Sequence, residues 1–228
     1  LCGGKGMLAA GSGREGDAWR TVAEKGGEGA LAALAEADAL ALVNWSELSF
    51  SQALWEGVLR HLLMPQMAEK QKVAFFDMAD LTRKTTKETM AVLRLMGEYS
   101  ARRTTMLSLN ENEALLCGQR ALGGEEDLVC IARGLRAQFG IDEVIVHTVR
   151  QSILCSPRGD TVVEIEPVLN PVRSTGAGDN FNAACCLGAV SGLGDEERLA
   201  LANASVRHFL LHGQSAGLHD LNEPEDRI

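Results

Sequence analysis

Short apolar runs alternate with helical segments along most of this chain, and this alternation restricts the folds open to it. The runs cover residues 39–43, 73–76, 105–109 and 143–146. Continuous apolar strands separated by helices of about a dozen residues are typical of βαβ units, in which helices cover both faces of a parallel sheet. We therefore predict an α/β fold with a mainly parallel central sheet.

Each apolar run gives way to a polar residue, namely Asn44, Asp77, Asn110 and His147. In an open parallel sheet, ligands bind beyond the carboxyl ends of the strands. The four residues are therefore candidates for a site at that edge. The alternative, that a strand simply ends where polarity begins, stays open for each residue taken singly.

The helices expected between these strands follow from apolar spacing of three and four residues. A break is expected at Gly26-Gly27, inside the first of them. The expected helices cover residues 17–37, 51–63, 86–97, 113–117 and 126–139.

The pattern changes after His147. Residues 152–155 and 161–165 flank a Pro157-Arg-Gly-Asp160 turn, which predicts a β-hairpin and hence antiparallel strands at one edge of the sheet. Two further helices are expected over residues 181–190 and 195–212. In the second, Leu199, Ala202, Val206 and Phe209 are expected to be buried.

Residues 175–179 read Thr-Gly-Ala-Gly-Asp and lead into an apolar, Ala-rich helical run. A turn of small residues at a helix start leaves backbone N–H groups free at the positive end of the helix dipole, which is a site for a phosphate. A carboxylate beside an anion makes sense if Asp179 accepts a proton from a group that attacks the phosphate. The alternative is that Asp179 only caps the helix.

Composition excludes several classes of protein. The chain has 228 residues, a net charge of −9 and no Lys/Arg run, which argues against nucleic acid or an anionic membrane as partner. No apolar stretch approaches the ~20 residues of a membrane-spanning helix, and no signal peptide is recognisable. The six cysteines include no Cys-x-x-Cys pair, so we expect free thiols in the reducing cytoplasm.

Two other patterns are weaker. Residues 11–16 match Gly-x-Gly-x-x-Gly, but no strand is expected before them, so we interpret the match as chance and set a dinucleotide-dependent oxidoreductase aside. His208 and His212 lie four residues apart on an expected helix, with apolar residues between them. A surface or core role explains them better than a metal site.

The order of strand–helix units, hairpin, Gly-Ala-Gly-Asp turn and two final helices resembles the ribokinase (PfkB) family of carbohydrate kinases. The segment Thr175–Ala183 matches the family's C-terminal signature, and Asn110-Glu-Asn-Glu113 matches its Asn-x-x-Glu motif. Residues 199–205 resemble its post-signature helix. The resemblance covers roughly residues 39–217 and implies a ribokinase-like three-layer α/β/α fold.

The resemblance also implies roles for single residues. Asp179 would be the catalytic base, and the amides of Gly176, Ala177 and Gly178 would form an anion hole. Asn110 and Glu113 would help to hold Mg²⁺, and five residues would contact ATP: Asn110, Glu113, Thr175, Asn203 and His147. A sugar would be the acceptor, and a homodimer is one assembly that the family allows.

The sequence departs from the family pattern in three places. Ser174 replaces the usual Asp, and residues 148–152 lack the glycines that normally follow the strand ending at His147. Arg150, in that stretch, would contact a phosphate or lie in solvent. The family's first hundred or so residues, with the sugar-binding Gly-Gly motif, the first strands and a β lid, have no recognisable counterpart.

We therefore expect an irregular or helical N-terminal remnant over residues 1–38, a ribokinase-like nucleotide-binding core over 39–221 and an acidic tail over 222–228. Two functions remain in view. One is an ATP-dependent sugar kinase, or its C-terminal portion. The other is a truncated or degenerate relative that binds a nucleotide without catalysis.

Overall fold

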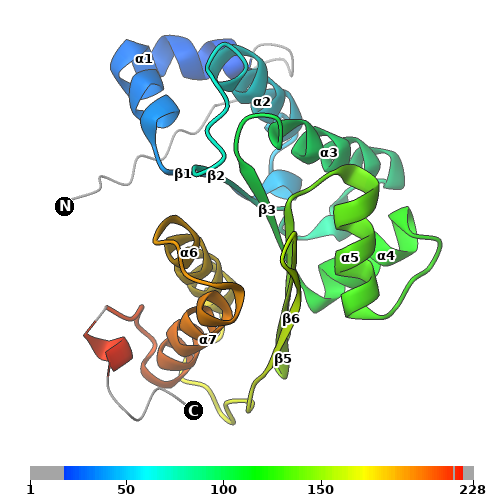
Figure 1. Cartoon of the computed structure of the whole chain (residues 1–228), viewed down its shortest axis with the longest axis vertical. Helices are drawn as coiled ribbons and strands as arrows, with labels where there is room; N and C mark the ends of the chain where they lie inside the picture. The colour runs from blue at the N-terminus through cyan, green and yellow to red at the C-terminus, as the bar shows by residue number, and fades with distance from the viewer. Residues whose placement is uncertain (1–17, 218, 223–228) are drawn as a thin grey trace.

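Within residues 18–217 and 219–222, which the computed structural model describes, the strands form one six-stranded mixed sheet (Figure 1). The spatial order of the strands follows the chain. Strands β1 to β4 are parallel, while β5 runs antiparallel to β4 and β6 antiparallel to β5. The strands are β1 (Ala39–Leu42), β2 (Val73–Asp77), β3 (Thr104–Asn110), β4 (Glu143–His147), β5 (Gln151–Ser156) and β6 (Gly159–Glu164). The predicted parallel sheet and its antiparallel edge hairpin are confirmed.

Helices cover both faces of this sheet, as the three-layer prediction requires. Helices α6 and α7 pack on one face and α3, α4 and α5 on the other (Figure 1). The α-helices are α1 (Ala18–Glu36), α2 (Ser51–Gly57), α3 (Thr86–Tyr99), α4 (Glu111–Ala121), α5 (Leu128–Phe139), α6 (Ala177–Val190) and α7 (Asp195–His212). Shorter helical segments are η2 (Trp45–Glu47), η3 (Val58–Leu63), η4 (Leu81–Arg83) and η5 (Asp220–Asn222).

Side-chain alternation along the strands divides the interior into two cores. Phe76, Leu107 and Val146 belong to the core shared with α2, α3, α4 and α5. The neighbouring residues along the same strands belong to the core beneath α6 and α7: Phe75, Met106 and Ile145. Successive side chains of a strand point to opposite faces, so a strand with helices on both sides must be apolar throughout.

Local capping explains where several helices begin and end. Thr85 and Glu88 form a capping box at the start of α3, in which each side chain bonds the other residue's backbone N–H. Gly140 ends α5 in the left-handed conformation, with φ 70°. Gly27, with φ 68°, interrupts α1 at the predicted break.

Some predicted helix bounds differ from those of the structure. The helix expected over 51–63 becomes a π-helix at Val58, and the Met64 N–H donates to the Leu59 carbonyl at 2.8 Å. Helix α4 is longer than the helix expected over 113–117. Asn110 is both the last residue of β3 and the N-cap of α4, so the helix begins directly after the strand. Helix α6 begins at Ala177 rather than Phe181, so the small-residue turn forms its first turn. Val206 is half-buried rather than buried.

A buried arginine attaches α1 to the sheet. The guanidinium of Arg103, just before β3, donates to the carbonyls of Ala35 at 2.7 Å and Ala37 at 2.9 Å. These carbonyls lie at the C-terminal end of α1, where unpaired acceptors and the helix dipole favour a cation. The division of the chain at residue 38 stays a prediction, as does the acidic tail, most of which lies outside the described residues.

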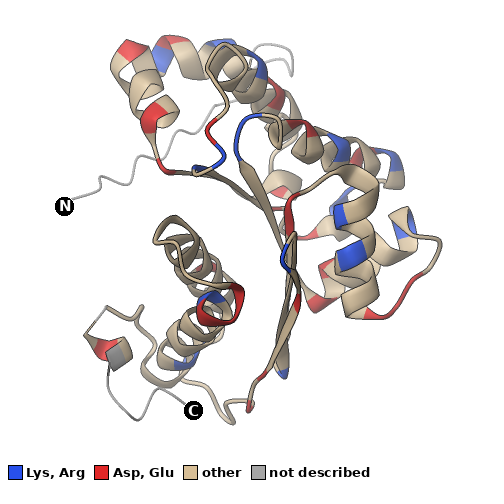
Figure 2. Ribbon diagram, viewed as in Figure 1, with Lys and Arg blue, Asp and Glu red and all other residues tan. Residues whose placement is uncertain are grey.

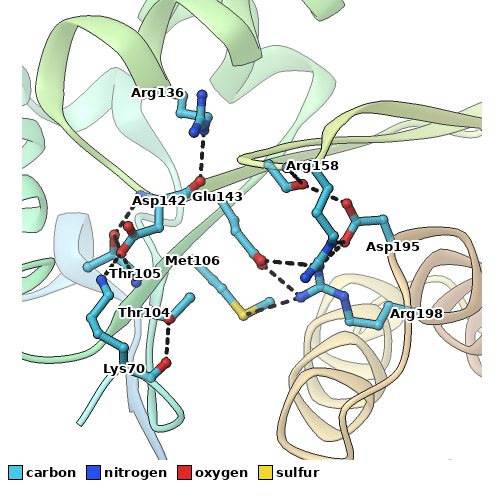
Figure 3. A network of polar contacts seen from close by, with 11 residues as sticks. Lys70, Thr104, Thr105, Met106, Arg136, Asp142, Glu143, Arg158, Asp195 and Arg198 are labelled. Carbon is cyan, nitrogen blue, oxygen red and sulfur yellow. Dashed lines mark hydrogen bonds and ion pairs between the residues drawn. The ribbon is translucent and has the colours of Figure 1, made fainter.

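A network of ion pairs and hydrogen bonds lies at the amino end of β4 (Figure 3). Arg198 of α7 donates to Glu143 of β4 at 2.7 Å and to Asp195 at 2.5 Å. Asp195 also accepts from Ser156 at 2.6 Å and pairs with Arg158 of the hairpin turn. Burial disfavours the ionised Asp195, but the hydrogen bonds from these partners outweigh it and lower its pKa to about 2. The network joins α7, β4 and the hairpin.

Charges are otherwise distributed over the helices. In the view of Figure 2, basic residues lie scattered among acidic ones on the outer helices, while the connection between α4 and α5 is acidic. Across the described ranges, no helix combines the length and apolarity that a membrane crossing demands. The Gly-x-Gly-x-x-Gly match at residues 11–16 lies outside the described residues.

Removing Arg198 should destabilise the fold strongly. Arg198→Met would leave Glu143 and Asp195 buried with fewer partners, and breaking a buried pair in this way costs about 3–5 kcal/mol. We expect the free energy of unfolding, measured by urea denaturation at neutral pH, to fall by that amount. The control is Arg133→Met, which breaks the exposed Arg133–Asp160 pair and should change the free energy of unfolding far less, because solvent screens exposed ion pairs. Equal losses in the two variants would contradict the importance of the buried network.

Candidate active site

Three polar side chains gather where strands β2, β3 and β4 end beneath helix α6. Phe75, Met106 and Ile145 face α6 and α7. Two residues later along each strand come Asp77, Ser108 and His147, which therefore face the same helices. The register places Asp77 beside Ser108 on neighbouring strands. The structure thus brings Asp77 and His147 to the same edge of the sheet, as expected. Asn44, the fourth strand-end residue, takes the left-handed conformation (φ 59°) and precedes the short helix η2.

The first turn of α6 has the backbone arrangement of an anion site. Gly176 precedes the helix with φ 102°, and Asp179 is the third residue of the helix, with its side chain exposed. N–H groups in the first turn of a helix have no acceptor four residues earlier within it. The Ala177 N–H donates to the Ser174 carbonyl at 3.0 Å, so one of the three predicted amides already has a partner.

Asn110 and Glu113 form a capping box at the junction of β3 and α4. The Asn110 N–H donates to Glu113 at 2.9 Å, and the Glu113 N–H donates to the Asn110 side-chain oxygen at 3.0 Å. Burial raises the pKa of the Glu113 carboxyl to about 7, and repulsion from Asp77 and Asp80 adds to the increase. A bound cation would relieve this cost. The two residues offer only oxygen ligands, as Mg²⁺ prefers.

These two residues would need water or a substrate to complete a metal site. In the described part of the chain, no three His, Cys, Asp or Glu side chains converge in a way that could hold a metal ion. Mg²⁺ normally keeps several waters and uses only one or two carboxylates. The donor set therefore fits Mg²⁺ held with substrate phosphates, and fits a site made by protein alone poorly.

A cavity of about 630 Å³ lies beside the start of α6. Asn110 and His147 border it from the sheet, Ala177 and Gly178 from α6, and Asn203 from α7. Apolar side chains that border it include Val149, Ile165, Val168, Val206 and Leu210, and charged residues that border it are Glu111, Glu166 and Arg207. A cavity lined by both apolar and polar groups suits a ligand with a charged and an aromatic part.

The remaining predicted nucleotide contacts have defined environments. The Asn203 side chain donates to the Ser152 hydroxyl at 2.9 Å. Burial lowers the pKa of His147 to about 4, so its imidazole is neutral at physiological pH, and its ring packs on Phe181 with centroids 4.7 Å apart. Thr175 is exposed beside Ser174, which does border the cavity. Arg150 is exposed.

A second, more acidic cavity of about 1010 Å³ adjoins the first across Asn110 and Asn112, which border both. Its walls come from the η4 turn, helix α4 and the connection between α4 and α5. The charged residues that border it are Asp80, Glu113, Glu125 and Glu126. Asn110 thus lies between the two cavities, and Glu113 borders the more acidic one.

Sequence reasoning missed two buried polar residues at this site, Ser108 and Asn182. Both are less than a tenth exposed. Ser108 donates to Asn182, and Asn182 donates to Asp77. The available signal was a polar residue between apolar neighbours: Ser108 between Leu107 and Leu109, and Asn182 between Phe181 and Ala183. His208 and His212, interpreted as non-metal residues, pack ring against ring at 4.4 Å.

The sheet order, the covering helices and the α6 turn define a ribokinase-like fold, and solved structures agree. Ribokinase from Thermotoga maritima matches with a TM-score of 0.63 and 18% identity, covering 84% of this chain and 57% of that one. A ribokinase II described as putative, from E. coli, matches with 0.64 and 20%, covering 84% and 58%. Adenosine kinase from Trypanosoma brucei brucei matches with 0.66 and 12%, covering 86% and 58%.

The sequence itself identifies the family. The family model described as prokaryotic ketohexokinase matches residues 3–226, so the chain belongs to that family. A ketohexokinase from Haloferax volcanii is 24% identical over 196 residues, which is 86% of this chain and 52% of that protein. The chain therefore spans about half the length of the curated relative that it matches. The resemblance to PfkB-type carbohydrate kinases is confirmed.

Two glycines at the start of α6 should respond differently to an added methyl group. A Cβ at Gly178 would meet nothing closer than 3.7 Å, the distance to a ring carbon of His147, so Gly178→Ala should fold normally. The methyl would project at a cavity-lining position and should weaken nucleotide binding. Gly176→Ala requires a side chain at φ 102° and 3.2 Å from Phe209, so it should lower the free energy of unfolding by about 1 kcal/mol or more. Thermal unfolding and ATP titration calorimetry of both variants check this. The reverse ranking of stabilities would contradict the geometry of the turn.

The Glu113 carboxyl should make stability fall as pH rises. Its pKa is about 7 in the fold and near 4.5 when unfolded, so between these values the folded chain holds a proton that the unfolded chain lacks. Glu113→Gln keeps an acceptor for the Asn110 N–H and removes the charge. We expect this variant to have a higher Tm at pH 8 and a flatter Tm profile between pH 4.5 and 7. The control is Glu111→Gln, an exposed neighbour in the same helix turn. Parallel profiles for wild type and Glu113→Gln would count against the buried charge.

Proposed function

We propose that this chain carries the nucleotide-binding and catalytic part of an ATP-dependent sugar kinase that phosphorylates a ketohexose. The observation that carries the proposal is the start of α6, where Ala177 and Gly178 border the cavity of about 630 Å³ and the exposed Asp179 follows them in the same helical turn. Membership of the prokaryotic ketohexokinase family supports the acceptor. A binding loop alone would have no use for an acid beside an anion.

In this proposal ATP occupies the 630 Å³ cavity. The adenine would lie against the apolar wall near Val206 and Asn203, and the phosphates would point to Ala177 and Gly178. The neutral His147 can approach a phosphate without carrying charge to it, and Phe181 holds its ring in place. Thr175 would contribute its backbone or hydroxyl beside the phosphates.

Asp179 would act as the general base. It removes the proton from the acceptor hydroxyl as the hydroxyl oxygen bonds to the γ-phosphorus, and the bond between the γ-phosphorus and the bridging oxygen breaks to release ADP. The N–H groups of Gly176, Ala177 and Gly178 would face the charge that develops on the transferred group, and donors of this kind typically contribute a few kcal/mol each. For the Ala177 N–H this requires release from the Ser174 carbonyl.

Asn110 and Glu113 would hold Mg²⁺, with water and phosphate oxygens as further ligands. When bound, the ion would neutralise phosphate charge and offset the repulsion that raises the pKa of Glu113. We further propose a cytoplasmic location, which agrees with the free thiols among the described cysteines, and a homodimer as one possible assembly.

The second candidate is a nucleotide-binding protein without catalysis. Ser174 in place of the usual Asp and the missing glycines after His147 favour it. Both candidates predict binding of Mg·ATP, but only the kinase releases ADP in proportion to an added ketohexose. A coupled assay for ADP on the full-length gene product therefore separates them.

Asp179→Ala should abolish turnover and preserve binding. A general base typically contributes a factor of about 10²–10⁴, so we expect kcat to fall by at least that factor. The affinity for a non-hydrolysable ATP analogue should change little, because Asp179 does not border the described cavity. The control is Glu196→Ala, which removes an exposed acid at the start of α7. Retention of most turnover in Asp179→Ala would contradict the assignment of the base.

A further inference from the structure

A buried hydrogen-bonded chain connects helix α6 to the ends of two strands. The Asn182 side-chain NH₂ donates to Asp77 at 2.6 Å, and its amide oxygen accepts from the Ser108 hydroxyl at 2.7 Å. Asp77 and Ser108 are register partners on β2 and β3. One side chain of α6 therefore bridges two neighbouring strands at the carboxyl edge of the sheet.

The bridge has a defined polarity. The carboxylate of Asp77 can only accept from Asn182, which assigns the amide nitrogen to Asp77 and leaves the amide oxygen for Ser108. The other Asp77 oxygen accepts from the Ala79 N–H at 2.8 Å. Asn182 is 7% exposed and Ser108 1% exposed, so the bond between them is shielded from water, while the bond from Asn182 to the half-buried Asp77 is partly shielded. Removing the Asn182 amide would leave the buried Ser108 hydroxyl without this acceptor and would take one of two hydrogen bonds from Asp77.

Asn182 lies one turn after Asp179 on the same helix. Residues three apart share a helix face, so the bridge fixes the rotation of α6 about its own axis at the turn that carries Asp179. The other α6 contacts with the sheet are apolar: Phe181, Ala184 and Cys185 pack in the same core. Apolar packing is non-directional and tolerates small rotations better than a pair of hydrogen bonds with fixed geometry does.

We infer that Asn182 is a positioning residue, which through its bonds to Asp77 and Ser108 holds Asp179 and the first-turn N–H groups of α6 at the reaction centre. The inference rests on the proposed function, because it concerns the placement of the proposed base. A misplacement of about 1 Å at a reacting group can cost a factor of 10² in rate. Asn182 itself touches no substrate, and its effect passes through α6.

The test compares kinetics in the full-length gene product carrying Asn182→Leu with those of a reciprocal exchange, Asp77→Asn with Asn182→Asp. Asn182→Leu keeps the number and branching of the side-chain heavy atoms and removes both bonds. We expect kcat to fall by about 10–100-fold while KM for ATP changes little, since the described cavity borders do not include Asn182. The exchange keeps every bond, because the new amide at position 77 can donate to the new carboxylate at position 182. Ser108 can donate to the other oxygen of that carboxylate. The exchange should restore most of kcat.

A matched variant separates positioning from stability. Cys185→Ser places a polar atom in the same core one turn further along α6 and leaves the bridge intact. It should lower Tm and leave kcat near the wild-type value. A normal kcat in Asn182→Leu with only a lowered Tm would overturn the inference. So would an exchange variant with restored Tm and no restored kcat, since the charge at residue 77 would then be what matters.

Ser108→Ala decides the case in which the exchange restores neither quantity. This variant frees one end of the Asn182 amide and leaves Asp77 and α6 in place. A reduced kcat with unchanged KM for ATP supports positioning, and an unchanged kcat overturns it.

Hydrogen exchange distinguishes failure of this inference from failure of the proposed function. The Asn180 amide, which donates to the Gly176 carbonyl at 3.1 Å, should exchange faster in Asn182→Leu than in wild type or Cys185→Ser, whether or not the protein is a kinase. Equal exchange rates would overturn the inference, while an inactive wild type with the expected exchange difference would overturn only the proposed kinase activity.

Discussion

Burial of both faces of strands β2, β3 and β4 is the constraint on which the rest of the structure depends. Each face must be covered by helices, so alternate residues of one strand belong to different cores. Polar side chains on these strands are then tolerated near a strand end or where a partner bonds them, as Asn182 bonds the buried Ser108. On the face beneath α6 and α7 those positions are occupied by Asp77, Ser108 and His147, and the candidate site is built from them.

Helix α6 links the covered sheet to the candidate active site. Its apolar residues bury against β2, β3 and β4, while its first turn projects past the strand ends to the cavity. The cost of this arrangement is electrostatic: Glu113 is buried and Asp77 half-buried, both lie near other acids, and burial raises the pKa of both. Fixed polar partners offset part of the cost, through Asn182 for Asp77 and through Asn110 for Glu113. A bound cation would offset more.

Much of the fold was predictable because local signals agreed with the tertiary arrangement. The apolar runs became strands, the Gly26-Gly27 break became a kink at Gly27, and the turn before Asp160 became a hairpin. The misses have physical causes. The change to a π-helix at Val58 had no signal in the apolar spacing, and α6 starts earlier than expected because small residues fit a first turn. Ser108 and Asn182 are ordinary polar residues until a partner 74 positions away in the chain is brought beside them.

The sequence by itself determined the fold class and the chemistry available at residues 175–179, because strand periodicity and helix capping are local properties. Family membership is carried by the sequence as well. Only the tertiary structure decided which polar groups meet. Alternation of side chains along the strands placed Asp77 and Ser108 on the face that α6 covers, beneath Asn182. Docking of α7 brought Asn203 to the same cavity as Gly178. These contacts between side chains depend on strand register and on helix rotation, which are set by the packing of the whole core rather than by any one segment.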